Sequence, residues 1–499
     1  MTDEKNNVGL RILPIALVLG LLGDHLLRAT PWGINLALWA LMLGAFVAAL
    51  GWRTRAFQAG GSWLLLPVLL FAGAIPWRDS MTLNFLGVFA ILVALALVVL
   101  RAQGGPIFAA YLVDYFLGGV IAWLNAAFGS LRLLIGDLPW RRIFGGTSSG
   151  RTLAVMCGLA LSLPLILVFG ALLVSADAVF AAIVKDVLNI DFANLVTHLF
   201  LTALFAWIAG GYLRGMLLGR EYEFASGARR QWFSLGIIEI GIALGLLNLL
   251  FLSFVIVQFR YFFGGTASIT LTPGLTYSEY ARRGFFELVT VAALVLPLLL
   301  LAHWLLHKEK PGNERLFRLL AGIQIVLLFV IMASAFQRMR LYQREYGMTE
   351  QRLYPTAFMA WLAVVFVWFA LTVLRGQRQY FAFGAMVAGF VLIAGLHILN
   401  PDALIARVNL TRALEGRRFD ARYVTGLSAD AVPELIAALA KLSATDRCIA
   451  AGRLLSFWSP PGESDWRTWN LARTRALEIV HQNRTQLRAM ACSEKAKND

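Results

Sequence analysis

The sequence predicts an all-α, polytopic transmembrane bundle of about eleven spans, followed by a small helical C-terminal domain outside the membrane. The 499-residue chain is 59% hydrophobic and 15% charged, with a mean hydropathy of +0.70. Soluble chains contain about 45–50% apolar and about 25% charged residues. The apolar residues gather into stretches of roughly 15–25 residues, separated by short arginine-bearing connections, as spanning helices require.

Eleven stretches are long and apolar enough to span. They cover about 12–27, 32–51, 56–77, 82–100, 153–174, 194–217, 233–257, 279–305, 316–336, 356–374 and 380–398. The first follows a charged start without a small-x-small cleavage site, so we expect a retained helix and not a cleaved signal. The chain then divides into a four-helix region over 1–101, a seven-helix core over 153–399 and a soluble helical domain over 400–499.

The segment between these regions, 102–152, is predicted as an amphipathic, interfacial linker. Its part 107–124 is apolar enough to span but carries Asp114 centrally, and apolar residues continue at helical spacing to Asp137. A helix lying along the membrane surface fits this pattern as well as a span does.

The distribution of positive charge distinguishes a topology with eleven spans from one in which 107–124 also spans, because short cytoplasmic loops are richer in Lys and Arg. With eleven spans, one face holds 19 such residues, including those of the N-terminus, and the other holds 10. If 107–124 also spans, the tally becomes 16 against 13. The first model therefore places the N-terminus in the cytoplasm and the C-terminal domain outside it, in the periplasm of a Gram-negative cell.

The C-terminal domain reads as three amphipathic helices. Asp430 is expected to cap the first, and the Ser459-Pro460-Pro461-Gly462 step to end the second. Cys448 and Cys492 are its two cysteines, and a disulfide between them would suit an oxidising compartment. Two unpaired thiols are the alternative, and no ligand spacing indicates a metal.

Two neighbouring outer loops concentrate arginine, tyrosine and glutamate. Such side chains can bind a phosphate, a carboxylate or a lipid headgroup. The alternative is that they bind one another and the backbone at a structured helix hairpin. The candidates are Tyr277, Glu279, Tyr280, Arg282, Arg283 and Glu287 in the first loop, and Arg338, Tyr342, Tyr346 and Arg352 in the second.

Three features resemble the bacterial integral membrane proteins grouped under domain of unknown function 4173 or the closely similar 4153 group. They are the run from Tyr277 to Leu288 in the first loop, the run in the second loop with Tyr342, Tyr346-Gly347 and Arg352, and Asn400-Pro401-Asp402 after the last span. The resemblance covers roughly residues 150–440. It implies a multi-pass protein of the bacterial cytoplasmic (inner) membrane without an established activity, and it adds no mechanism.

Inside the predicted spans, Glu239 and Asn248 are the polar candidates. A carboxylate in hydrocarbon is costly unless it faces the bundle interior. Glu239, about seven residues into its predicted span, could carry protons or bind a cation, or could receive hydrogen bonds from a packed helix. Gly241 and Gly245 on the same helix favour close packing.

No nucleotide loop, zinc-protease motif or nucleophile elbow occurs in the sequence, so no catalytic residue, cofactor or metal is predicted. The basic balance is explained by cytoplasmic loops, which makes nucleic acid a poor candidate partner and leaves the lipid bilayer as the expected one.

Three functions remain open. The first is transport of a small molecule or ion past Glu239, with the outer arginine loops as vestibule, which the number of spans and the embedded carboxylate favour. The second is a sensory or scaffolding protein whose outer domain binds an envelope partner. The third is a lipid or glycan enzyme that uses Glu279 and Glu287.

Overall fold

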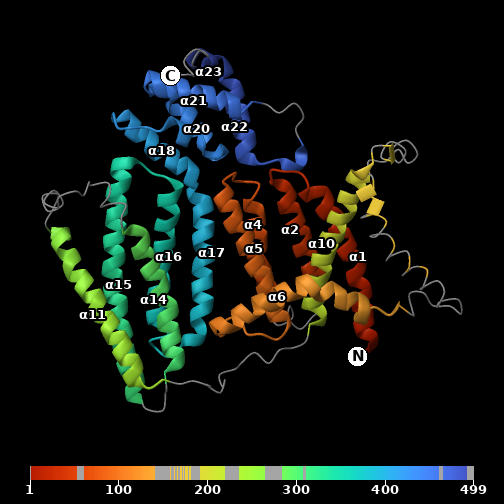
Figure 1. Cartoon of the computed structure of the whole chain (residues 1–499), viewed down its shortest axis with the longest axis horizontal. Helices are drawn as coiled ribbons and strands as arrows, with labels where there is room; N and C mark the ends of the chain where they lie inside the picture. The colour runs from red at the N-terminus through yellow and green to blue at the C-terminus, as the bar shows by residue number, and fades with distance from the viewer. Residues whose placement is uncertain are drawn as a thin grey trace.

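The computed structural model describes residues 2–52, 61–140, single positions between 155 and 180, and 192–219, 235–263, 284–306, 311–459 and 465–491. These residues form an all-α protein, in which the one β contact is an isolated bridge between Leu235 and Leu306. A helical bundle is therefore confirmed (Figure 1).

The membrane part consists of two half-bundles with separate hydrophobic cores. The first half-bundle contains α1 (Thr2–Leu27), α2 (Ile34–Gly51), the 3-10 turn η1 (Gly61–Leu65), α4 (Leu66–Ala74), α5 (Met81–Ala102), α6 (Leu112–Arg132) and α10 (Phe192–Leu218). The second contains α11 (Ile237–Phe263), α14 (Phe285–Leu305), α15 (Pro311–Tyr346) and α16 (Glu350–Thr372).

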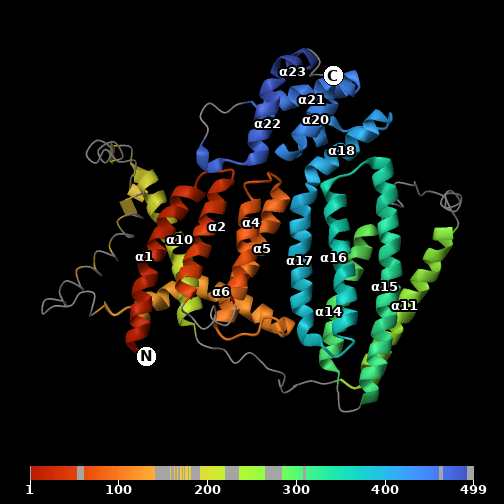
Figure 2. The same cartoon turned by 180° about the vertical axis from the view of Figure 1, so that it is seen from behind.

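Helix α17 (Phe381–Leu399) joins the two half-bundles. Its Phe381 belongs to the core of the second half-bundle, whereas its Ile393 belongs to the core of the first. It packs against α16 on one side and against α5 and α4 on the other. Figures 1 and 2 both show α17 between the halves.

Ten helices of the described residues are long and apolar enough to cross a membrane, and η1 with α4 forms a shorter apolar helix over Gly61–Ala74. Nine of the predicted spans coincide with long helices, and 56–77 coincides with this shorter one. The stretch 279–305 is described only from Gly284 onward. The remaining prediction, 153–174, lies mostly outside the described residues.

Helix α6 is the tenth candidate when it is counted through the π-helical turn η2 (Leu133–Asp137). Both views show it running across the lower ends of the neighbouring helices and not alongside them. Asp114, which the sequence placed at the centre of an apolar stretch, lies in the first turn, where its carboxylate accepts from the Tyr111 amide at 2.9 Å. At the other end, Arg214 of α10 binds Asp137 at 2.8 Å. The interfacial position of α6 stays a prediction, because its length and composition also permit a span.

The C-terminal domain lies at the end of the bundle opposite the N-terminus (Figure 1). It has its own core and comprises α18 (Pro401–Leu414), α19 (Ala421–Val424), α20 (Val432–Ala438), α21 (Ala444–Phe457), α22 (Leu471–Gln482) and α23 (Arg484–Met490). The three expected helices are found as α20, α21 and α22, while α18 was not foreseen.

The Asn-Pro-Asp step forms the joint between α17 and this domain. Asn400 has a φ of 55° and a ψ of 77°, a left-handed conformation that asparagine tolerates better than most residues. It ends α17 and caps α18, because its side-chain oxygen accepts from the Ala403 amide at 3.4 Å. Pro401 follows at the first helical position, where a missing N–H costs nothing.

Candidate functional site

The outer loops of the sequence prediction are partly described. Tyr277, Glu279, Tyr280, Arg282 and Arg283 lie outside the described residues. Glu287 lies exposed in the first turn of α14. Arg338, Tyr342 and Tyr346 lie on the last turns of α15, and Arg352 on the first turn of α16.

Three arginines bind the carboxyl end of α15. Arg352 donates to the carbonyls of Tyr346, at 3.1 Å, and of Gly347. Arg412 donates to the carbonyls of Arg344 at 3.2 Å and Glu345 at 2.6 Å, and Arg417 also donates to that of Arg344, at 2.6 Å. Helix ends leave such carbonyls without partners and carry partial negative charge, so cations there are stabilising.

The turn between α15 and α16 is fixed by the C-terminal domain. Asn409 of α18 accepts from the Met348 amide at 2.9 Å and donates to the Met348 carbonyl at 2.7 Å. Gly347 has a φ of +78°, and a Cβ there would come within 2.2 Å of the Asn409 side-chain oxygen. Only glycine fits this position, which explains the Tyr-Gly step of the second run.

Between this turn and the domain lies a pocket of about 960 Å³. We call it the arginine pocket. It is lined by five arginines and three carboxylates, together with apolar and aromatic side chains; the charged members are Arg352, Arg412, Arg417, Arg418, Arg422, Glu345, Asp420 and Asp446.

The carboxylates of the arginine pocket are mostly engaged elsewhere. Asp420 caps α19 by accepting from the Tyr423 amide at 2.9 Å, and Asp446 accepts from the Ser443 hydroxyl at 2.7 Å. Arg418 and Arg422 are exposed, and their side chains make no hydrogen bond or ion pair with any part of the chain that the structure describes. The arginine pocket therefore offers two unpaired guanidinium groups, which suit a phosphate or a carboxylate.

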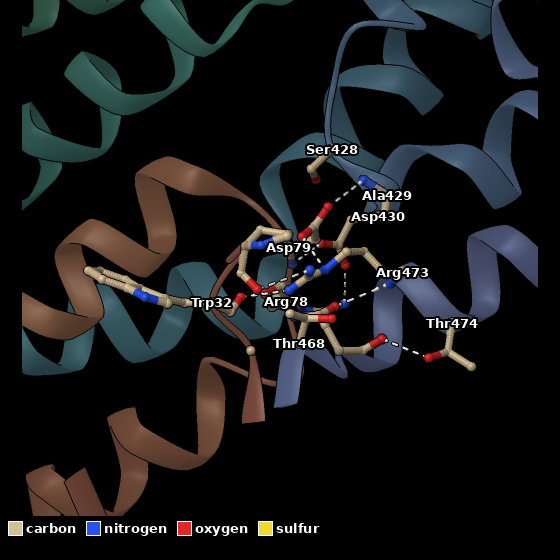
Figure 3. Close-up of polar contacts among 12 residues, drawn as sticks. Trp32, Arg78, Asp79, Ser428, Ala429, Asp430, Thr468, Arg473 and Thr474 are labelled. Atoms are coloured by element: carbon tan, nitrogen blue, oxygen red, sulfur yellow. Dashed lines mark hydrogen bonds and ion pairs between the residues drawn. The ribbon is translucent and has the colours of Figure 1, made fainter. Parts of the chain in front are cut away.

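A second polar cluster, which we call the junction, ties the domain to the first half-bundle (Figure 3). Arg78 binds Asp430 at 3.0 Å with its Nη1 and donates to the His397 carbonyl at 2.9 Å with its Nε. Asp79 binds Arg473 of α22 at 3.0 Å. Arg473 also donates to the Trp32 carbonyl at 2.6 Å.

Asp430 corrects an expectation. The sequence predicts that it caps a helix, yet α20 has no side-chain cap. Its carboxylate, whose side chain is 2% exposed, accepts instead from Arg78, from the Asp79 amide at 2.8 Å and from the Asn400 side chain at 3.2 Å. Buried charges are retained when they are paired and hydrogen-bonded, as this one is.

The junction brings together carboxylates that are buried from solvent. Burial raises the pKa of Asp79 to about 6, with smaller raising effects from Asp430 and Asp402, while Arg473 opposes the shift. Burial also raises the pKa of Asp402. Asp402 is 2% exposed and accepts from the Ser428 amide at 3.2 Å through one oxygen only. Among the described residues, no group of three or more His, Cys, Asp or Glu could hold a metal ion.

The intramembrane candidates lie apart from both clusters. Glu239 is exposed in the first turn of α11, and not about seven residues into a span as predicted, because the helix begins at Ile237. Asn248 is buried and donates to the Leu320 carbonyl of α15 at 2.9 Å. That contact is an interhelical hydrogen bond of the kind that holds membrane helices together.

Cys448 lies on α21 and is disulfide-bonded. Cys492 lies outside the described residues, so the pairing of these two cysteines stays a prediction.

The arginines that the domain contributes to the arginine pocket were not predicted from the sequence; they are Arg412, Arg417, Arg418 and Arg422. The available signal was their density, four arginines within eleven residues at and after the end of the helix that begins at Asn-Pro-Asp. Their meeting with the α15–α16 turn depends on the fold of the domain over the bundle.

The fold and its clusters define a multi-pass helical membrane protein that carries a folded domain on one face. The model of the domain of unknown function DUF4153 matches residues 65–438, about three quarters of the chain, and the chain therefore belongs to this family. The match includes both outer runs, most of the arginine pocket and the bundle side of the junction. No curated protein and no solved structure gives a match.

Proposed function

We propose that this DUF4153 protein is an anion-binding membrane sensor, with the arginine pocket as its ligand site on the extracytoplasmic face. The observation that supports this proposal is the pair of unpaired guanidinium groups, Arg418 and Arg422, in a pocket built between the domain and two membrane helices. Charge-assisted hydrogen bonds to phosphate or carboxylate are among the stronger polar contacts in proteins.

The position of the arginine pocket suits signalling. One wall is the α15–α16 turn, and the other is formed by α18, α19 and α21. The Tyr423 hydroxyl accepts from the amide of Glu350 at 2.9 Å, so the domain holds the first turn of α16 directly. A ligand that prefers one distance between the two walls shifts the population of domain positions. An envelope partner that binds the domain would respond to that shift.

Transport is the weaker candidate. Glu239, its proposed carboxylate, is exposed at a helix end. The large cleft between the half-bundles is lined almost wholly by apolar side chains, which gives an ion no polar route.

The proposal is tested by thermal unfolding of the purified full-length protein with inorganic phosphate as the probe. Ligands that bind only the folded state raise the unfolding temperature as their concentration passes the dissociation constant. We expect phosphate to stabilise the wild type more than sodium chloride of equal ionic strength. The double variant Arg418→Ala/Arg422→Ala should lose that difference.

Arg475→Ala is the matched control, because Arg475 is also exposed on the domain but lies outside the arginine pocket. It should respond to phosphate as the wild type does. Equal responses of the wild type and the double variant would remove the arginine pocket as the anion site.

A further inference from the structure

A large apolar cleft lies between the two half-bundles. Its volume is about 1030 Å³, and it is lined by α5, α6, α14, α16 and α17. On α5 and α17 most of the lining residues belong to the half of each helix nearest α6, so the cleft lies toward the N-terminal face of the bundle. This end is opposite to the arginine pocket, and the inference is independent of the proposed function.

Two of the polar side chains in the cleft wall already have hydrogen-bond partners. The Tyr115 hydroxyl donates to the Ile107 carbonyl, and the Trp361 indole donates to the Ala385 carbonyl at 3.2 Å. The remaining lining is largely aliphatic and aromatic, including Phe89, Phe116 and Phe390. Water or a polar ligand would find few partners here, whereas a hydrocarbon chain fits such a surface.

A cation stands at the N-terminal-face mouth of this cleft. The Arg378 guanidinium lies over the Tyr111 ring, 4.8 Å from its centroid. Tyr111 directly precedes the lining residue Leu112, and Arg378 lies three residues before the lining residue Phe381. Arg378 makes no hydrogen bond or ion pair with a described residue, so its charge is not neutralised by a carboxylate of the described chain.

We propose that the cleft is a phospholipid site, in which the acyl chains fill the space between the half-bundles and the phosphate lies against Arg378. The apolar lining selects the chains, and the single arginine at the mouth selects an anionic headgroup. The lipid would add to the contact that α17 makes between the two half-bundles at this end.

The test counts bound lipid by native mass spectrometry of the full-length protein, purified in mild detergent and incubated with phosphatidylglycerol. Gly119 lines the cleft, and a Cβ built there meets nothing within 4 Å, so Gly119→Trp fills the cleft without a backbone clash. Gly245→Trp is the matched control, because Gly245 of α11 is equally open and lies outside the cleft lining. Circular dichroism and gel filtration establish that both variants fold.

We expect the wild type and Gly245→Trp to retain phosphatidylglycerol and Gly119→Trp to lose it. Arg378→Gln should weaken binding of phosphatidylglycerol about tenfold, the effect of losing one charge-assisted hydrogen bond, and should leave uncharged diacylglycerol unaffected. Arg375→Gln, an exposed arginine nearby, should change neither.

Equal lipid retention by wild type and Gly119→Trp would overturn the site. Crosslinking of a Phe116→Cys variant to another polypeptide in the membrane would also overturn it, because it would show that a protein helix occupies the cleft.

Discussion

Asp79 couples protonation to the attachment of the C-terminal domain. Burial first, and the neighbouring Asp430 and Asp402 next, raise its pKa from 3.8 to about 6. The folded protein thus holds this proton more tightly than the unfolded chain does. The stabilising contribution is complete below about pH 4 and is lost as the pH rises through about 6. The difference between the two pKa values of Asp79 corresponds to at most about 3 kcal/mol in the free energy of unfolding.

We therefore expect the unfolding temperature of the purified protein to fall between about pH 4 and about pH 7, and Asp79→Asn to reduce this slope. Asp402, whose pKa is also raised, contributes in the same direction, so some slope remains. Asp420→Asn is the control, because Asp420 is exposed, caps α19 and lies outside the junction. It should lower stability by at most about 1 kcal/mol and leave the slope unchanged. An unaltered slope in Asp79→Asn would contradict the assignment.

Residue roles were predictable where they depend on local chain geometry. Tyr346-Gly347 and Asn400-Pro401-Asp402 stood out as motifs, and the structure gives each a backbone reason, a φ of +78° at Gly347 and of 55° at Asn400. Asp430 was misassigned, because its partners Arg78 and the Asp79 amide come from about 350 residues earlier in the chain. A sequence read through local spacing contains no signal for such a contact.

At the scale of elements, glycines set the crossing of α6 and α10. A Cβ on Gly211 would lie 2.4 Å from the Asn125 carbonyl oxygen, and one on Gly129 would lie 2.6 Å from that of Gly211. Backbone atoms cannot move aside as a flexible side chain can. The Ser130 hydroxyl then donates to the Trp207 carbonyl across the crossing at 2.6 Å.

We expect Gly211→Ala to destabilise the first half-bundle by about 1–3 kcal/mol, the usual cost of overpacking, measured as a lower unfolding temperature. Gly136→Ala is the matched control, because a Cβ at Gly136 meets nothing within 4 Å. If both variants unfold at the wild-type temperature, the close approach of α6 and α10 does not exist in solution.

Hydropathy predicted most of the elements, because the lipid imposes length and composition on each span separately. Hydropathy was least decisive for α6. Its composition permits a span, but the helix runs across the ends of its neighbours. Hydropathy also underestimated α15, which extends to Tyr346 and carries Arg338 beyond the apolar part. There Arg338 donates to Gln258 of α11 at 2.6 Å, so tertiary contacts prolong the helix past its hydrophobic stretch.

At the scale of the whole molecule, the C-terminal domain is the second link between the half-bundles. It contacts the first half-bundle through the junction and the second through the α15–α16 turn. Together with α17 it holds two separate cores in one molecule. Sequence patterns predicted both kinds of part, but not this arrangement, because it depends on contacts between segments hundreds of residues apart.

The arrangement also predicts a topology. The N-terminus and the domain lie at opposite ends of the bundle, and the positive-inside tally of 19 against 10 puts the N-terminal face in the cytoplasm. We therefore expect Glu415→Cys, exposed on the domain, to react with a membrane-impermeant maleimide in intact cells. Arg375→Cys, exposed in the connection between α16 and α17, should react only after lysis. Both are made with Cys157, Cys448 and Cys492 replaced by alanine.

The native cysteines provide a second, independent test of the side on which the domain lies. In cells carrying Cys157→Ala alone, labelling of the domain should require prior reduction, since Cys448 is disulfide-bonded and disulfides persist in oxidising compartments. In the reverse pattern, Arg375→Cys is labelled in intact cells and Glu415→Cys only after lysis. That result would place the C-terminal domain in the cytoplasm and the N-terminal face outside it. The arginine pocket would then face cytoplasmic anions and the phospholipid cleft the outer leaflet, so this labelling decides which ligands each site meets.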